Sequence, residues 1–554
     1  MNFEDEVNAD AVSQAGLEKL GYKQEMTRHV MFVVVASLEV EYRYCSLSWQ
    51  SVCLSSDLLN IATYPPVAFG ISSPIATSLV GGGPAVIIWG WILVSFLTQT
   101  LALSLAEICS KYPTSAGTYY WCYRLASPRT RLLASWINGW LTVVGGWTVD
   151  LSVKFATTQL VVAGAGIYYS EWSPTTLQTC THLFVVSEIL IVYQIICACW
   201  TGVGIITKAA AGRHPVFFAL GNFDPSFSGW TPGWSFFIGI LPPGKILTNE
   251  YVSNNGLGHI HSADTQKPVA NMAEEVHNPS KILPKAIISS VPIGSLTGMV
   301  FLLPILFTLP DVATLLQVSS GQPIGVMFTL IMGSKAGGFG LVSFNRSLPS
   351  GAASLIWRGI QWFIIFGIGM FCSISTSCAS SRATWAFARD KAIPFHQLLS
   401  KISPHLDDVP VNALLLSTVI QILLGLVYLG SSAAFNAFAG VAVMCLGASN
   451  AMPVAILLMN ARRDMHDAPF NLGRFGTVIN AVAVLWIMFV TVLFSMPAVI
   501  PVTRWSMNYA SAVFGGFGVI SAVWYMISGQ FYYRGPPIQE EPTSSSGSSD
   551  SASL

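Results

Sequence analysis

The chain has 554 residues, of which 52% are hydrophobic and only 10% are charged, and its formal net charge is zero. Soluble domains carry about 25% charged residues, so the composition indicates a membrane protein. A balanced charge provides no basic surface for nucleic acid, and we expect no nucleic-acid partner. The sequence also lacks the short alternating strands of a transmembrane β-barrel, which leaves membrane helices.

Long uncharged runs predict the membrane helices. A helix needs about 20 apolar residues to cross the bilayer core, and each run is long enough. In chain order, the predicted spans are 84–106, 132–153, 178–200, 286–309, 362–383, 411–430, 434–459, 477–502 and 507–530. Two less regular candidates lie near 46–80 and 234–250, and the apolar piece 320–334 is short enough to be re-entrant or interfacial. The fold class is therefore an all-α polytopic membrane protein.

The distribution of Lys and Arg predicts the sidedness of the chain. Basic loops at 111–131, 267–285, 382–401 and 462–474 alternate with loops that have no Lys or Arg. Basic loops face the cytoplasm, so we expect both termini to be cytoplasmic. We assign residues 1–29 to a cytoplasmic N-terminal segment, 30–533 to the transmembrane domain and 534–554 to a disordered cytoplasmic tail.

The number of membrane crossings between two cytoplasmic loops must be even, and here one crossing is missing. Loops 111–131 and 267–285 should both be cytoplasmic, yet only three candidate spans separate them. The fourth should lie within about 201–225, where Lys208, Arg213, His214 and Pro215 stand. Each charge at a helix centre costs about 2.5–3.5 kcal/mol on insertion scales. Either this segment crosses the bilayer poorly or the chain lacks a helix.

Three ordered motifs carry a family resemblance. They read "GGGPAVIIWGWILVSFLTQTLALSLAEICSKYPTSAGTYYW" at 81–121, "MAEEVHNPSKILPKAI" at 272–287 and "SSRATWAFARDKAIPFH" at 380–396. With "LEKLGYKQEMTRH" at 17–29, this set resembles the amino acid–polyamine–organocation superfamily. More narrowly, it is similar to fungal permeases for amino acids, GABA and choline.

The resemblance implies both a fold and a function. The fold would hold two inverted five-helix repeats and two extra C-terminal helices, about 10–12 transmembrane helices in all. Its first and sixth helices would be broken near the midplane, where freed backbone groups bind substrate. The implied function is secondary active transport of amino acids or related amines such as GABA and choline, by alternating access. A proton is the candidate coupling ion, and the plasma membrane is the expected location.

The run "WSFFIGILPP" at 234–243 is the candidate first half of the broken sixth helix. Two prolines lack N–H donors and clash with the preceding turn, a glycine allows close approach of a ligand, and the aromatic rings can stack on an ammonium group. The candidate substrate-binding residues here are Phe236, Phe237, Gly239, Pro242 and Pro243. The alternative is a proline-kinked structural helix with core aromatic residues.

Serines of the predicted span 362–383 are further substrate-binding candidates. Ser373 and Ser377, with Ser375 between them, either line the cavity or permit close helix packing. Charged residues at membrane depth also suggest function, and the candidates are Asp57, Asp150, Lys154 and Glu188. Asp150 and Lys154 are four residues apart and can pair on one helix face, although snorkelling near the outer interface explains them equally well.

A candidate gate lies at the cytoplasmic side. The resemblance places Glu274 and Glu275 at the cytoplasmic end of the sixth helix, where they can pair with Arg382 or Arg389. Asp390, next to Arg389, completes the gating candidates. A solvated charged face is the alternative interpretation.

The chain departs from the family pattern in three places. The break motif of the first helix is not recognisable in 40–80, and the fifth helix is degraded or missing. Segments 244–271 and 342–361 look like insertions. One hypothesis covers these features: the reading frame includes intervening sequence and omits a coding piece. Sequencing the mature transcript tests it.

Two other classes of function stay open. An intramembrane enzyme needs clustered His, Asp or Cys at membrane depth, and only His182 of the nine histidines lies inside a clear span. The cysteines have no zinc or disulfide spacing, so we predict no metal site. We also predict no catalytic residues and no cofactor. The third class is a non-transporting sensor or a defective protein derived from such a permease.

Overall fold

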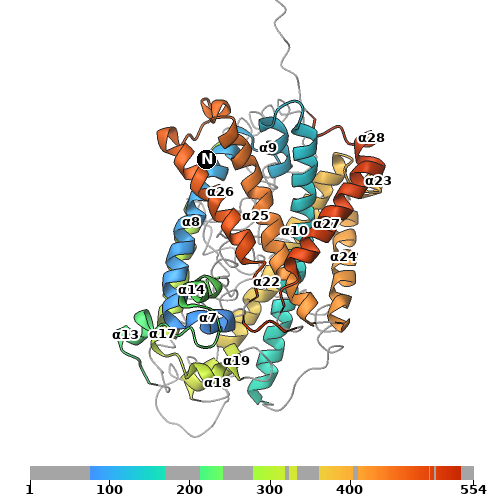
Figure 1. Ribbon diagram of the computed structural model, residues 1–554. Helices are drawn as coiled ribbons and strands as arrows, with labels where there is room; N and C mark the ends of the chain where they lie inside the picture. The colour runs from blue at the N-terminus through green and yellow to red at the C-terminus, as the bar shows by residue number, and fades with distance from the viewer. Residues whose placement is uncertain are drawn as a thin grey trace, which may run out of the picture.

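A computed structural model describes residues 75–168, 212–240, 279–317, 323–333, 361–402, 410–430, 432–497, 499–503 and 507–537. These residues form a bundle of helices, and no strand occurs among them (Figure 1). Several sequence predictions lie outside the described residues: segment 1–29, the span 178–200, the insertion 244–271, positions 342–360 and 538–554, and the residues Asp57, Glu188, Pro242, Pro243, Glu274 and Glu275.

Long helices stand where the charge-free runs predict them. They are α8 (Pro84–Lys111), α10 (Arg131–Tyr168), α17 (Pro279–Phe307), α22 (Gln361–Arg389), α24 (Val411–Gly430), α25 (Ser432–Met459), α26 (Gly476–Leu493) and α27 (Ala510–Trp524). By length and composition, five described stretches can cross a membrane: Pro84–Lys111, Pro279–Phe307, Gly440–Met459, Gly473–Leu493 and Ala510–Tyr532.

Two predicted boundaries are wrong. The span expected at 132–153 continues as a helix to Tyr168. The span expected at 477–502 ends as a helix at Leu493. Pro497 and Pro501 follow within eight residues of that end. Proline has no N–H to continue the helix and restricts the residue before it, so the chain turns instead.

Shorter helices connect the long ones or cap the two ends of the bundle. They are α7 (Ile75–Gly82), α9 (Thr118–Leu125), α13 (Val216–Gly221), α14 (Pro232–Gly239), α18 (Val312–Leu316), α19 (Pro323–Met332), α23 (His396–Leu399), α28 (Gln530–Tyr532) and the 3-10 turns η3 (Arg463–Met465) and η4 (Gly473–Phe475). The 10 residues of α19 span only about 15 Å, too short to cross a bilayer, as its sequence predicts.

The helix α10 is the central element of the bundle. Its 38 residues reach about 57 Å and run the full height of the molecule (Figure 1). It packs on α22, α24 and α25, while α8 packs on α17 and α26.

Glycine residues allow the closest contacts between these helices. A Cβ at Gly139 of α10 would lie 2.2 Å from the Phe387 ring of α22, and one at Gly298 of α17 would lie 2.2 Å from the Trp91 ring of α8. Small residues at such contacts are typical of helix packing in membranes.

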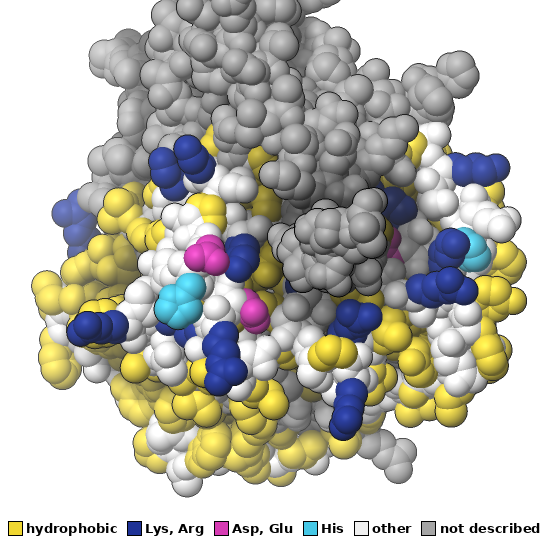
Figure 2. All heavy atoms as spheres, turned by 90° about the horizontal axis from the view of Figure 1, so that it is seen from above, with side chains coloured by type: hydrophobic (Ala, Val, Ile, Leu, Met, Phe, Trp, Pro, Cys, Tyr) yellow, Lys and Arg dark blue, Asp and Glu magenta, His cyan; other side chains and the backbone are white. Residues whose placement is uncertain are grey.

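Positive charge gathers at one end of the bundle, which we call the basic end. Figure 2 views this face and shows many Lys and Arg side chains but few acidic ones. It carries α9, α23 and α28 and lies at the top of Figure 1. Among its cations are Arg124 on α9, Lys391 just before α23 and Arg534 just after α28. The short helices α7, α13, α14, α18 and α19 lie toward the opposite end.

Candidate functional site

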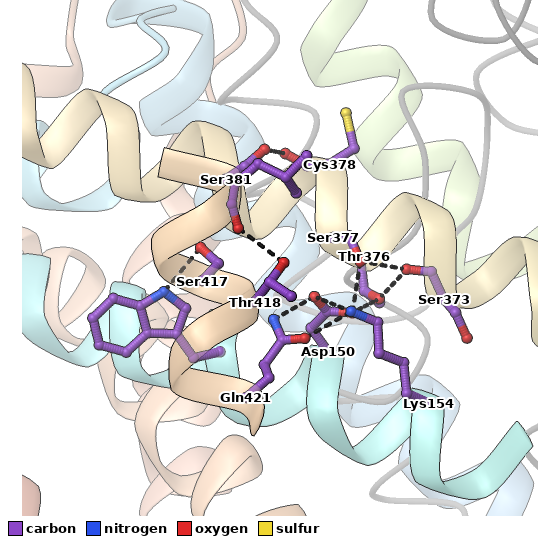
Figure 3. A network of polar contacts seen from close by, with 12 residues as sticks. Asp150, Lys154, Ser373, Thr376, Ser377, Cys378, Ser381, Ser417, Thr418 and Gln421 are labelled. Carbon is purple, nitrogen blue, oxygen red and sulfur yellow. Dashed lines mark hydrogen bonds and ion pairs between the residues drawn. The ribbon is translucent and has the colours of Figure 1, made fainter. Parts of the chain in front are cut away.

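A polar network joins three long helices in the interior of the bundle (Figure 3). At its centre is the carboxylate of Asp150 on α10, which has no exposed surface. Its Oδ1 atom accepts hydrogen bonds from Thr376 Oγ1 (2.5 Å) and Ser377 Oγ (3.1 Å) of α22. Its Oδ2 atom accepts from Gln421 Nε2 of α24 (2.6 Å). The carboxylate therefore binds α22 and α24 to α10.

Lys154 completes this network one turn along α10. Its Nζ atom lies 3.3 Å from Asp150 Oδ2 and donates to Gln421 Oε1 at 2.7 Å. The predicted pairing of the two residues on one helix face is confirmed. The side chain is only 15% exposed, and its ammonium group points to the carboxylate and the amide. A buried charge needs such partners, because an isolated ion is costly away from water.

The predicted serines of α22 face α10. Ser377 donates to Asp150 and also to the carbonyl of Ser373 (2.9 Å). The Ser373 hydroxyl donates to the carbonyl of Gly369 (3.0 Å) and lies 3.4 Å from Thr157 Oγ1 on α10. Both serines thus lie at the interface of α10 and α22, within or beside the Asp150 network.

A second site lies where α7 meets α14. A Cβ built on Gly81 of α7 would lie 2.2 Å from the Cα of Gly239 of α14, so the two backbones are in direct contact. Ser78 Oγ donates to the carbonyl of Gly239 (2.9 Å), and Ser235 Oγ donates to the carbonyl of Gly81 (2.7 Å). The α14 helix ends at Gly239, which agrees with the predicted end of a half-helix ahead of two prolines.

The aromatic residues of α14 pack away from the Asp150 network. The Phe237 ring lies 5.2 Å from the Phe489 ring of α26 and 5.8 Å from Phe236. Phe237 also lines an open apolar groove of about 310 Å³ between α8 and α26, together with Leu93, Leu97, Val482, Leu485, Trp486 and Phe489. Among the described residues, the substrate-binding candidates therefore form two groups, one at α14 and one at α22.

The described gating candidates lie in the last part of α22 and just after it, near the basic end of the bundle. The carboxylate of Asp390 accepts a hydrogen bond from the Tyr119 hydroxyl of α9 (2.8 Å), which also lies 3.2 Å from the carbonyl of Ala386. The guanidinium of Arg389 lies 4.6 Å from the centre of the Trp385 ring. Arg382, two turns earlier on α22, is buried.

Sequence reasoning missed a buried ion pair near the same end. Arg462 Nη2 donates to Glu107 Oε1, which also accepts from the backbone N–H of Leu472 (3.0 Å). Glu107 is the single charge in the apolar run 84–110, and that isolation was a usable signal. Gln421 and Thr376 were missed because a single uncharged polar residue in an apolar helix does not by itself indicate a functional site. In the described part of the chain, no three His, Cys, Asp or Glu residues cluster as a metal site would require.

Comparisons with known proteins agree with this architecture. A family model described as amino acid permease matches residues 49–518. The chain is 30% identical to the amino-acid permease BAT1 homolog of Oryza sativa over 94% of this chain and 95% of the relative. It is 28% identical to a choline transporter of Saccharomyces cerevisiae, covering 90% and 84% of the two chains. It is 27% identical to the polyamine transporter TPO5 of the same yeast, covering 87% and 77%. The family model covers most of the chain, and the structure is a helical bundle. The chain therefore belongs to the amino acid permease family.

Proposed function

We propose that this protein is a secondary active transporter that carries an amino acid or a related amine, choline and polyamines included, by alternating access. The contact between α7 and α14 is the observation that carries the proposal. Two short helices end where their backbones touch at Gly81 and Gly239. Irregular backbone at membrane depth is tolerated only where it is buried in protein or lines a cavity. Interrupted helices bind substrate in secondary transporters, and the proposal takes α7 and α14 as parts of such helices.

The chemistry of these helix ends favours a cationic group. The C-terminal ends of α7 and α14 converge, and helix C-termini carry partial negative charge from their carbonyl groups. An ammonium group is the matching ligand. Phe236 and Phe237, the adjacent aromatic residues, remain candidates for contact with that group, and so do Pro242 and Pro243. The names of the similar proteins point to the same ligand class, since they specify amino acids, choline and polyamines.

The sidedness follows from charge. The basic end would face the cytoplasm, because Lys and Arg accumulate in cytoplasmic loops. Arg382, Arg389 and Asp390 would then form the described part of a cytoplasmic gate, with Glu274 and Glu275 as its partners. A proton is the candidate coupling ion, the plasma membrane is the candidate location, and both termini would be cytoplasmic.

Uptake of radiolabelled amino acids, choline and spermidine into transporter-null cells tests the function. We expect one substrate class to accumulate above the empty-vector level. The variant Gly239→Val should abolish uptake at normal surface expression, because a Cβ at Gly239 would lie 2.6 Å from the Val86 side chain and 3.1 Å from the Gly81 Cα. The matched control is Gly515→Ala, since nothing lies within 4 Å of a Cβ there.

Two outcomes would contradict the proposal. Normal surface expression without uptake of any solute would favour the alternative of a non-transporting sensor or a defective protein. Uptake that is equal in Gly239→Val and Gly515→Ala would remove the α7–α14 contact from the transport site.

A further inference from the structure

The chain does not leave the bundle directly after its last long helix. A π-helical turn, Tyr525–Gly529, follows α27, and α28 then leads to Tyr533. The side chain of Tyr533 is 4% exposed, while its neighbours Phe531 and Tyr532 are 67% and 63% exposed. Burial is therefore selective for one of three consecutive aromatic residues. A π-turn adds one residue per turn and so changes which side chain faces inward.

Tyr533 enters the bundle between α10 and α22. Its hydroxyl shares a 2.7 Å hydrogen bond with the hydroxyl of Ser135 on α10. Its ring lies edge-on to the Trp136 ring at 5.2 Å and to the Phe387 ring of α22 at 6.2 Å. Aromatic pairs at such distances and angles are stabilising beyond the area that they bury.

Glycines on both sides of Tyr533 allow this close fit. A Cβ at Gly529 would lie 2.7 Å from the Trp136 ring. Gly535 has a φ angle of +82°, in the region that favours glycine, and a Cβ there would lie 2.3 Å from the Tyr123 ring of α9. The segment from the π-turn to Gly535 is thus shaped to lie against α9 and α10.

The Phe387 ring links Tyr533 to the gating candidates. Phe387 also contacts Tyr119, with ring centres 5.3 Å apart, and the Tyr119 hydroxyl donates to Asp390. A second link runs nearby, because the indole N–H of Trp524 on α27 donates to the carbonyl of Ala392, two residues after Asp390 (3.3 Å). The segment from Trp524 to Tyr533 therefore contacts the chain on both sides of Asp390, at Phe387 before it and at Ala392 after it.

We propose that Tyr533 is a positioning residue for the gate: it holds Phe387, and through Phe387 and Tyr119 the Asp390 carboxylate, in the arrangement seen here. The inference rests on the proposed function, in which Asp390 belongs to the cytoplasmic gate. Withdrawal of Tyr533 frees the end of α22 to move away from α9 and opens the basic end of the protein.

Burial raises the pKa of the Tyr533 hydroxyl well above its ordinary value, and the negative charge of Asp390 raises it further. The hydroxyl therefore stays protonated at physiological pH, and the hydrogen bond to Ser135 is present throughout that range. Ionisation of Tyr533 therefore plays no part in this role, and the position of the gate is set by the ring contacts to Trp136 and Phe387.

Cysteine labelling tests the role without requiring transport. Ser381→Cys places a thiol on α22 at a position that is 3% exposed in this structure. Its labelling rate with a maleimide is measured in inside-out vesicles, after subtraction of the rate for the parent protein. We expect Tyr533→Ala in this background to raise the rate about five-fold or more, the lower end of typical coupling between two sites.

Adjacent and conservative variants provide the controls. Tyr532→Ala, which changes an exposed ring, and Tyr533→Phe, which keeps the ring contacts, should both label at the wild-type rate. Tyr533→Leu keeps apolar volume without a ring and should label fast, and it replaces Tyr533→Ala if that variant does not fold.

The outcomes separate this inference from the proposed function. Equal labelling of Tyr533→Ala, Tyr533→Leu and Tyr532→Ala overturns the positioning role, even if the variants at position 533 melt at a lower temperature. Fast labelling with no transport by the wild type supports the positioning role and rejects transport. Fast labelling by Tyr533→Phe would assign the role to the hydroxyl instead of the ring and overturn the ring-contact mechanism.

Discussion

Glu107 of α8 and Arg462, just after α25, form an ion pair that is almost completely buried, with the carboxylate at 0% and the arginine at 9% side-chain exposure. The pair joins residues 355 positions apart in sequence. Arg462 Nη1 also donates to the carbonyl of Gly473 (2.8 Å), so the arginine connects α8 to the turn before α26.

Removal of one partner of this pair should be strongly destabilising. Glu107→Ala leaves a buried guanidinium without its carboxylate, and loss of one member of a buried pair costs about 3–5 kcal/mol. The double variant Glu107→Ala/Arg462→Met should be more stable than Glu107→Ala alone. Melting curves of the detergent-solubilised protein, followed by size-exclusion chromatography, measure this. If the double variant loses as much as the sum of the single variants, the two residues are not coupled.

Gly476, at the start of α26, should tolerate no side chain while this pair exists. A Cβ there would lie 1.8 Å from Arg462 Nη1, so Gly476→Ala must push the arginine away from Glu107. We expect a loss of about 1–3 kcal/mol, as for other overpacked sites. The same substitution in the Glu107→Ala/Arg462→Met background should have little effect, because the methionine can move aside. An equal loss in both backgrounds would show that the clash is with something other than Arg462.

Loss of Asp150 alone should destabilise the network more than removal of both of its charges. Asp150→Ala leaves Lys154 with only Gln421 as a partner among its hydrogen bonds described here and should cost about 3–5 kcal/mol. Asp150→Asn/Lys154→Met removes both charges and keeps a polar group beside Thr376 and Gln421, so it should be more stable than Asp150→Ala. The melting assay described above checks the order. A double variant that is less stable than Asp150→Ala would mean that the charge pair itself stabilises the bundle.

The hydroxyl of Tyr119 should be needed to hold Asp390. Tyr119→Phe removes a donor to a carboxylate that is 8% exposed, and hydrogen bonds to charged groups contribute about 1.5–3 kcal/mol. Melting of this variant should be compared with Tyr532→Phe, whose ring is exposed at the same end. Equal melting temperatures would show that the Tyr119–Asp390 bond contributes nothing to stability.

Asp311, which caps α18, should give this helix a pH dependence. Hydrogen bonds from the backbone N–H and then the hydroxyl of Thr314 lower the pKa of its carboxyl below 3.8. A lowered pKa means that the ionised form stabilises the folded helix, so the cap is intact above pH 3.8 and is lost as the pH falls through the lower value. Hydrogen exchange of 311–317, corrected for intrinsic rates, should rise over that range. Asp311→Asn cannot ionise and should show no such rise; if it behaves like the wild type, another group is responsible.

The helices could be predicted from sequence because a charge-free run of the right length has few alternatives in a membrane. Val411–Gly430 was predicted with the same bounds that the structure has. The pairing of Asp150 with Lys154 was also predictable, since residues four apart share a helix face. Gln421 was not, because its role depends on a carboxylate 271 positions away.

Orientation was the hardest property to predict. Apart from Ser235, the α14 sequence has no polar side chain, so its periodicity does not say where its aromatic residues pack. That Phe237 packs on Phe489 of α26 required the fold. The positions of Lys and Arg assigned Arg462 only to a basic loop. Its ion pair with Glu107 depends on how α25 and α26 pack on α8.

The contact between α7 and α14 is self-complementary. Ser78 donates to the carbonyl of Gly239, and Ser235 donates to the carbonyl of Gly81, so each helix supplies one hydroxyl donor and one glycine carbonyl acceptor. Two-fold symmetric interfaces between identical subunits have this property. Within a single chain, the two reciprocal bonds connect the helices at two separate points beside the glycine contact. Ser78→Ala and Ser235→Ala each leave one glycine carbonyl without its donor, and Ser235→Ala also removes the 2.6 Å bond to Ser228 Oγ, so it should lower the melting temperature more.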